Sequence, residues 1–269
     1  MKNRLIRFLA SILGIFGRAT GLTNVPFLQN LYFRLAGPAM PTEDLWVTMD
    51  GQQILIPNPR DNVLGRRIYL HGIWEEDVTR VLCEEIRPGM TTLDVGAHIG
   101  YYTLLMAKRV GNQGHVFSFE PNPVVRNYLE QNIKRNQYSQ VTICPVALFS
   151  KAGYGALEGR DNLNSVLSNH PSSTDSKVSI AVFDQIKNDL GIQKVNLIKM
   201  DVEGAELDIL LGMRKMLTDD HPALIIEIHQ VGLIHFDHTE SEFRRFVMSV
   251  GYTITTIWSH INTTTVLCR

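Results

Sequence analysis

The segment TTLDVGAHIG, residues 91–100, constrains the fold of this chain more than any other. It begins as an apolar, β-prone run, turns between Gly96 and Gly100, and continues into the helical pattern YYTLLMAKRV. Such a tight turn lets the backbone come close to a ligand, and the first N–H groups of the following helix have no partner within the helix. The pattern predicts a strand, a turn and a helix, with a polar or anionic ligand held at the turn.

A carboxylate at the end of the next predicted strand extends this pattern. Residues 116–119 are predicted to form a buried strand, and Glu120 follows at its carboxyl end. Because neighbouring parallel strands end at the same edge of a sheet, Glu120 is placed to accept hydrogen bonds from both hydroxyls of a ribose. The turn lacks the G-x-G-x-x-G pattern of NAD sites, and Asp94, just before Gly96, suits a charged amino group or a hydroxyl. These features together favour a nucleoside cofactor that carries an amino acid.

Apolar runs and helical patterns alternate along the chain, which is typical of a parallel sheet with helices on both faces. A hairpin with an Asp50-Gly51 turn is expected before the sheet, and an antiparallel hairpin around Ile261-Asn262 at its edge. A polar segment, residues 150–176, is interpreted as either a substrate-facing flap or a surface excursion. The predicted helix before the sheet covers 73–86, and the strands cover 93–95, 116–120, 141–148, 178–183, 195–201, 223–229, 252–258 and 263–268.

The N-terminal residues 1–44 differ from the rest and are expected to form an amphipathic helical segment ahead of a single domain, residues 45–269. Three basic residues precede ten uncharged ones, too few to span a bilayer as a helix, which takes roughly 20 apolar residues. Three interpretations stay open: a helix packed on the domain, an interfacial membrane helix, and a cleaved signal peptide. We expect a cytoplasmic protein that is membrane-associated only if residues 1–20 make a peripheral contact.

The charge balance argues against nucleic-acid binding, and the spacing of the cysteines argues against a disulfide framework or a zinc site. With 26 basic and 27 acidic residues the formal net charge is −1, so the chain lacks the excess of positive charge that favours nucleic-acid binding. The three cysteines, Cys83, Cys144 and Cys268, lie far apart in the sequence. We therefore expect reduced thiols rather than a disulfide framework or a zinc site.

Several motifs occur together in the order of a known family. The residues DVGAHIGYYT, FEPNP, the region of Ala147, and IKMDVEGAELDILLG followed by LIIEIH resemble the FkbM family of class I S-adenosylmethionine-dependent methyltransferases. The resemblance extends from about Trp74 to the end of the chain. One departure is His98, where the family more often has Asn. The resemblance implies an α/β, Rossmann-like fold with a seven-stranded, mostly parallel sheet and a C-terminal antiparallel hairpin.

The resemblance also implies a cofactor and the residues that hold it. Asp94, Gly96 and Ala97 would hold the methionine end of S-adenosylmethionine, Glu120 its ribose hydroxyls, and the region of Ala147 its adenine. The predicted cofactor-binding residues are Asp94, Gly96, Ala97, His98, Gly100, Glu120, Pro121 and Ala147.

Polar residues follow two predicted strands that should lie side by side. Lys199 and Asp201 point to one face of the first strand, and Glu227 and His229 point to one face of the second. Charged groups are costly inside a parallel sheet unless they are paired or used. One interpretation is structural: a Lys199–Glu227 ion pair, with Asp201 capping the next helix.

A functional interpretation of the same residues starts from methyl transfer. A hydroxyl is a weak nucleophile unless its proton is removed, and Asp201 or His229 could be the base, with Glu203 as a further candidate. A divalent cation on Asp201, Glu227 and His229 is a less favoured alternative. The predicted catalytic residues are therefore Asp201, His229 and Glu203.

The predicted function is an O-methyltransferase that acts on a small molecule or on a sugar or glycan. Two alternatives stay open: an NAD-type oxidoreductase, and a non-catalytic nucleoside-binding module on the same sheet. A methyltransferase of nucleic-acid bases is disfavoured, because the relevant strand ends in KMDVEG rather than in an Asn-Pro-Pro-aromatic or Pro-Cys motif.

Overall fold

The computed structural model describes residues 40–159, 163, 165–168 and 176–269. The chain divides into two compact units, Met1–Glu76 and Asp77–Arg269. The expected N-terminal helical segment lies almost entirely outside the described residues, so that element and the boundary after residue 44 stay predictions. Within the described part of the chain, no helix is both long and apolar enough to cross a membrane.

The first unit contains the predicted hairpin. Strand β1 (Leu45–Met49) pairs antiparallel with β2 (Gln52–Ile56). Asp50 and Gly51 in the turn both have positive φ, 47° and 74°, as the tight turns of two-residue hairpins require. A helix that sequence reasoning missed, α3 (Val63–His71), follows the hairpin and starts after an Asn62 cap.

The second unit is built around a seven-stranded sheet with the order β12-β13-β11-β10-β3-β4-β5. All neighbouring strands are parallel except around β13, which runs antiparallel to both β11 and β12. This confirms the predicted mostly parallel sheet with a C-terminal antiparallel hairpin. Its strands are β3 (Thr91–Val95), β4 (His115–Phe119), β5 (Val141–Cys144), β10 (Leu197–Met200), β11 (Ala223–His229), β12 (Ile254–His260) and β13 (Thr263–Cys268).

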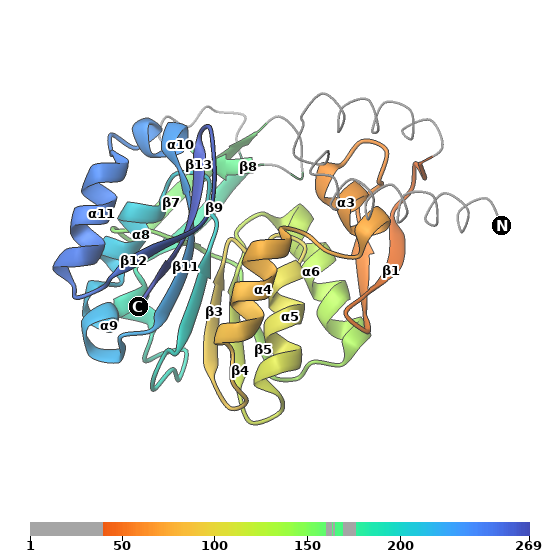
Figure 1. The fold of residues 1–269 in the computed structure, drawn as a ribbon, viewed down its shortest axis with the longest axis horizontal. Helices are drawn as coiled ribbons and strands as arrows, with labels where there is room; N and C mark the ends of the chain where they lie inside the picture. The colour runs from red at the N-terminus through yellow and green to blue at the C-terminus, as the bar shows by residue number, and fades with distance from the viewer. Residues whose placement is uncertain (1–39, 160–162, 164, 169–175) are drawn as a thin grey trace. The chain divides into compact units, whose positions relative to one another are not determined.

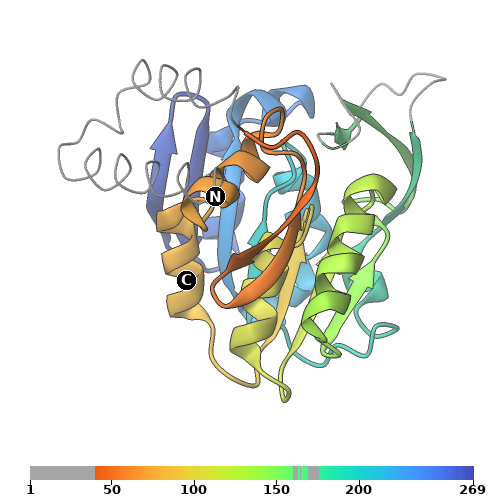
Figure 2. The same cartoon turned by 90° about the vertical axis from the view of Figure 1, so that its right-hand side faces the viewer.

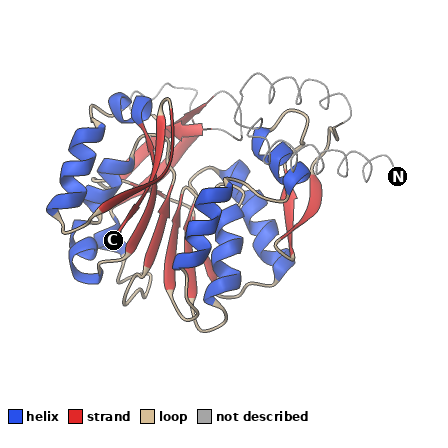
Figure 3. Ribbon diagram, viewed as in Figure 1, coloured by secondary structure: helices blue, strands red, loops and turns tan. Residues whose placement is uncertain are grey.

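Helices cover both faces of this sheet, as Figures 1 and 3 show. One face carries α4 (Glu76–Glu85), α5 (Tyr101–Val110) and α6 (Pro123–Asn136), which stand side by side in front of the sheet in Figure 2. The other face carries α8 (Glu206–Gly212), α9 (Arg214–Asp220) and α11 (Glu240–Ser249). The short helix α7 (Phe183–Ile186) contacts α8 and α9, and α10 (Gln230–His235) follows the end of β11. Because both faces are covered, the central strands are mostly apolar, with Leu93, Ile198 and Ile226 fully buried, and the polar groups among them are confined to a few positions such as Asp94 and Lys199.

A second, four-stranded sheet with the order β6-β9-β7-β8 corrects two predictions. The strand expected over residues 141–148 breaks at Pro145, which has no N–H for a ladder, and its end forms β6 (Ala147–Leu148). The strand expected over 178–183 forms β9 (Ser176–Ala181), outside the main sheet. Its polar–apolar alternation suits burial on one side only. The polar segment contributes β7 (Gly153–Gly159) and β8 (Ser165–Leu167).

Candidate active site

The turn after β3 has the predicted strand–turn–helix form, and its glycines allow close contacts with other parts of the chain, while the expected approach to a ligand stays a prediction. Gly96 has φ +80°, and a Cβ built on it would lie 1.9 Å from the carbonyl oxygen of Asp201. A Cβ on Gly100, at φ +89°, would lie 2.5 Å from Cδ1 of Leu129. The close approach is therefore to other parts of the chain, and Gly96 brings the turn against the end of β10.

His98 shows why the turn tolerates a residue other than Asn. Its φ is +51°, in the left-handed region where His and Asn are enriched over most other residues. Its backbone N–H donates a 2.8 Å hydrogen bond to Oε2 of Glu120, and its ring Nε2 lies 3.0 Å from the carbonyl oxygen of Leu163. The contact that joins the turn to Glu120 is thus made by the backbone, which an Asn could also make.

Glu120 lies at the carboxyl end of β4 and is only 6% exposed. Its other oxygen, Oε1, accepts a 2.8 Å hydrogen bond from the N–H of Asn122. Burial raises the pKa of Glu120 to about 7, although the hydrogen bonds from Asn122 and His98 and the charge of Arg126 oppose the rise. A carboxylate has about four acceptor positions, so acceptor capacity remains for two further donors.

Asp94 lies inside the sheet and is 1% exposed. Its Oδ2 accepts a 2.5 Å hydrogen bond from the hydroxyl of Thr103, which in turn lies 2.9 Å from the hydroxyl of Ser118. Burial raises the pKa of Asp94 to about 6, while the Thr103 hydrogen bond and the charge of Lys199 act in the opposite direction. Its predicted contact with a cofactor amino group stays a prediction.

The remaining predicted cofactor residues lie near this edge in sequence and structure. The N–H groups of Gly96 and Ala97 both donate to the carbonyl oxygen of Phe119, at 3.0 and 3.1 Å. Pro121 follows Glu120 directly, and its carbonyl oxygen accepts a 3.0 Å hydrogen bond from Arg126. Ala147 is buried on β6.

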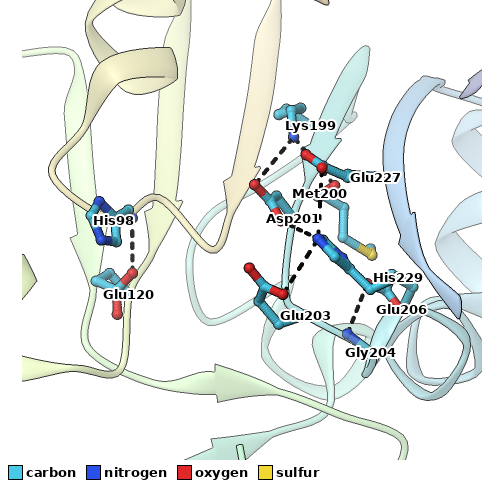
Figure 4. A network of polar contacts seen from close by, with 10 residues as sticks. All are labelled: His98, Glu120, Lys199, Met200, Asp201, Glu203, Gly204, Glu206, Glu227 and His229. Carbon is cyan, nitrogen blue, oxygen red and sulfur yellow. Dashed lines mark hydrogen bonds and ion pairs between the residues drawn. The ribbon is translucent and has the colours of Figure 1, made fainter. Parts of the chain in front are cut away.

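The structure brings the predicted catalytic residues together around one imidazole (Figure 4). Nε2 of His229 lies 3.8 Å from Asp201, 3.4 Å from Glu203 and 3.6 Å from Glu227. Its other ring nitrogen, Nδ1, lies 3.1 Å from Oε1 of Glu206. We refer to these five residues, Asp201, Glu203, Glu206, Glu227 and His229, as the carboxylate–imidazole cluster.

The four carboxylates change the protonation of His229. Burial by itself lowers the pKa of an imidazole, but the hydrogen bond to Glu206 and the charges of Asp201 and Glu203 outweigh it and raise the pKa to about 10. The surrounding carboxylates thus favour the protonated ring, and the predicted role of His229 as a base stays a prediction.

Glu206 is the cluster residue whose role sequence reasoning missed. It is fully buried at the start of α8, and its Oε1 also accepts a 2.9 Å hydrogen bond from the N–H of Gly204. The sequence signal was present, because Glu206 follows the KMDVEGA run, but a glutamate in a first helical turn is ordinarily read as a partner of the helix dipole.

The structural interpretation of the polar strands is wrong in one respect. The cap residue of α8 is Ala205, and no side chain makes the cap hydrogen bond, so Asp201 does not cap that helix. Asp201 instead lies with Oδ2 3.9 Å from the ammonium group of Lys199. Lys199 is fully buried and stacks its ammonium 4.9 Å above the ring of Tyr102.

A pocket of about 410 Å³ opens beside the cluster, with Glu203 and His229 in its wall. Two residues of the predicted polar flap, Glu158 on β7 and Val166 on β8, line it as well. The other lining residues come from α10 and from the tip of the C-terminal hairpin, and they are Val231, Gly232, His235, Asn262 and Thr263.

Comparisons with known proteins match the same part of the chain. A family model described as the methyltransferase FkbM domain matches residues 94–254. The hexuronic acid methyltransferase AglP of Haloferax volcanii is 30% identical over 157 residues, which cover 58% of this chain and 62% of that protein. Methyltransferase 1 of Beauveria bassiana is 30% identical over 155 residues, which cover 49% of this chain and 60% of that protein.

A solved structure, methyltransferase FkbM from Methylobacillus flagellatus KT, superimposes with a TM-score of 0.49 and 17% identity, covering 76% of this chain and 52% of that one. The matched part of the chain covers less than two thirds of the length of the two curated relatives, from Haloferax volcanii and Beauveria bassiana. The family model covers more than half of the chain, from Asp94 in β3 to the first residue of β12. The chain belongs to the FkbM methyltransferase family.

Proposed function

We propose that this protein transfers a methyl group from S-adenosylmethionine to a hydroxyl of a sugar or another small polar molecule. The observation that carries the proposal is the contact between Gly96 and Asp201. It joins the turn that faces Glu120 to the carboxylate–imidazole cluster. A nucleoside site and a set of proton-accepting groups therefore share one edge of the sheet, where open α/β sheets bind their ligands.

The residues at the nucleoside side fit this cofactor. Glu120 is buried and held by two backbone N–H groups, yet it retains acceptor capacity for the two hydroxyls of a ribose. When bound, S-adenosylmethionine supplies a methyl group on a positively charged sulfur. The family match favours this cofactor over the nicotinamide of the oxidoreductase alternative.

Calorimetric titration with S-adenosylhomocysteine tests the cofactor half of the proposal. We expect saturable binding by the wild type and a loss of at least tenfold in affinity, about 1.4 kcal/mol, for Glu120→Ala. Glu130→Ala, on the exposed side of α6, should bind as the wild type does. Absence of binding by folded wild-type protein would sink the methyltransferase proposal and bring the binding-module alternative forward.

The affinity for S-adenosylhomocysteine should also depend on pH. The pKa of Glu120 is raised to about 7, so the carboxylate that accepts the ribose hydroxyls is mostly ionised at pH 8 and mostly protonated at pH 6. We expect affinity to fall about tenfold between these two values as the acceptor is protonated. The pKa of Asp94 is raised only to about 6, so its protonation should affect the affinity only at the acid end of this pH range. Calorimetry across this range should show the fall in the wild type and a flatter profile in Glu120→Ala.

The carboxylate–imidazole cluster supplies the group that takes up the proton of the substrate hydroxyl. Oxygen of the acceptor attacks the methyl carbon as the sulfur–carbon bond breaks, the bonding pair stays on sulfur, and the hydroxyl proton passes to a carboxylate. Asp201 and Glu203 are the accessible acids of the cluster, with side chains 32% and 59% exposed. His229 has carboxylates beside both ring nitrogens and is only 14% exposed, so we assign the proton to one of the two more exposed acids.

The pocket lining favours a hydroxylated acceptor. Asn262, Thr263 and His235 offer hydrogen-bond donors and acceptors around the wall, beside the cluster. The relative from Haloferax volcanii is named for methylation of a hexuronic acid, which supports a sugar acid as the first acceptor to try. Methyl incorporation from labelled S-adenosylmethionine into hexuronic acid glycosides, with neutral hexosides beside them, tests this choice. Incorporation into neutral hexosides alone would contradict it.

A further inference from the structure

Three side chains of the cluster have the arrangement of a cation site. Asp201, Glu227 and His229 each offer one ligand atom, and these atoms all lie within 4.8 Å of one another. Nε2 of His229 is 3.8 Å from Asp201 and 3.6 Å from Glu227. Two ligands about 2.1 Å from one ion are separated by roughly 3.0 Å at adjacent octahedral positions and roughly 4.2 Å at opposite ones, so these spacings can close on a single ion. We propose that Asp201, Glu227 and His229 bind a divalent cation of the Mn²⁺ type at the wall of the acceptor pocket.

The orientation of the imidazole supports this assignment. Nδ1 of His229 lies 3.1 Å from Oε1 of Glu206, a fully buried carboxylate that can only accept a hydrogen bond when ionised. Nδ1 therefore carries the hydrogen, and Nε2 is left to face Asp201 and Glu227. A carboxylate that fixes the far nitrogen of a histidine in this way is a recurrent feature of metal sites.

A second, independent observation is an unsatisfied buried oxygen in the same cluster. Oε2 of Glu206 has no hydrogen-bond partner among the described residues, although Glu206 is 0% exposed. A buried carboxylate with an unpartnered oxygen is costly unless positive charge lies close by. Four carboxylates lie around one imidazole here, so negative charge is concentrated at this point of the fold. A divalent ion bound beside His229 would place positive charge next to these carboxylates and reduce the cost of burying them.

The ligand set suits a catalytic rather than a purely structural ion. Two carboxylates and one imidazole are hard and intermediate donors, which favours Mn²⁺ or Mg²⁺ over the thiolate-seeking metals. Three protein ligands leave positions open in an octahedral shell. His229 lines the 410 Å³ pocket, so an acceptor oxygen in that pocket can reach an open position.

The role of the ion, though not its site, rests on the proposed methyl transfer. A cation that binds the acceptor oxygen lowers the pKa of the hydroxyl. With Asp201 engaged as a ligand, the released proton passes to Glu203, whose side chain is 59% exposed and lines the same pocket. The carbon–oxygen bond then forms as the carbon–sulfur bond breaks, and the electron pair remains on sulfur.

Titration of the full chain with Mn²⁺, followed by the electron paramagnetic resonance signal of free Mn²⁺, tests the site without any turnover. We expect one ion per chain for the wild type, with S-adenosylhomocysteine present at saturation. Asp201→Asn and Glu227→Gln should each weaken Mn²⁺ binding at least tenfold. Glu158→Gln, a carboxylate in the same pocket but outside the ligand set, should bind Mn²⁺ as the wild type does.

Two results would overturn the cation site. One is no Mn²⁺ binding by folded wild-type protein; the other is binding that neither Asp201→Asn nor Glu227→Gln weakens. Circular dichroism of each variant shows that it is folded, and Asp201→Asn, at a partly exposed position, covers the case in which Glu227→Gln fails to fold. Calorimetry with S-adenosylhomocysteine on the same samples distinguishes failure of the cation site from failure of the proposed function. If the protein binds S-adenosylhomocysteine but not Mn²⁺, the cation site is wrong and the proposed function stands.

Discussion

Asp201→Asn is expected to lower kcat for methyl transfer by about 10³-fold, within the range ascribed to a positioned acid or base. The amide of Asn binds a divalent cation less strongly than a carboxylate does, so the variant loses the ion that assists transfer of the hydroxyl proton to Glu203. The affinity for S-adenosylhomocysteine should stay within threefold of the wild type, because Glu120, the proposed partner of the ribose, lies at the end of a different strand. Methyl incorporation from labelled S-adenosylmethionine into a hexuronic acid glycoside measures the first effect, and calorimetry measures the second.

A matched control separates this effect from a general loss of charge. Asp189 is exposed, between α7 and β10, and Asp189→Asn should leave kcat unchanged. Glu203→Gln should lower kcat while Mn²⁺ affinity is retained, since Glu203 is assigned the proton rather than the ion. An Asp201→Asn enzyme that keeps more than a tenth of the wild-type kcat would contradict the assignment of Asp201.

Gly96→Ala is expected to lower the free energy of unfolding by about 3 to 5 kcal/mol. Part of the loss, about 1 to 2 kcal/mol, is the cost of a left-handed backbone at a residue with a Cβ. The rest comes from overlap, because the new methyl would lie 1.9 Å from the carbonyl oxygen of Asp201 and must push apart two neighbouring strand ends. Urea denaturation followed by circular dichroism measures the change.

Gly89 offers a nearly ideal comparison for that measurement. Its φ is +83°, close to the +80° of Gly96, but a Cβ built there meets nothing within 4 Å. Gly89→Ala should therefore show only the backbone cost. Equal losses at the two positions would mean that the contact with Asp201 contributes nothing to stability.

The local features of the cofactor side were predictable from the sequence because they depend on residues close together in the chain. The strand, turn and helix over residues 91–110 are encoded by an apolar run, two glycines and a helical pattern. The position of Glu120 was predictable for the same reason, because the apolar residues just before it form the strand that it follows. The break at Pro145 was missed, although a proline has no N–H to donate to a strand ladder and is itself a local signal of an interruption.

The features that were not predictable depend on contacts between distant segments. The reason for glycine at position 96 is the carbonyl of Asp201, far along the chain. The same holds for His229, which was predicted as a base by itself but lies among carboxylates from residues 201–206 as well as Glu227 on its own strand. Pairing of β9 with β6 and β7 likewise depends on which strands meet in space.

The pocket and the cluster beside it are built by different parts of the fold, and this has an evolutionary consequence. The ligands and acids of the cluster stand on β11, on the turn after β10 and at the start of α8, at the edge of the central sheet. Most of the pocket wall comes from β7, β8, α10 and the tip of the terminal hairpin, which are peripheral segments. Under the proposed function, substitutions at Glu158, Val231 or Asn262 are expected to change which acceptor enters, while the proposed ligands and acids stay in place. A lineage with this architecture can diversify its substrates without rebuilding its chemistry.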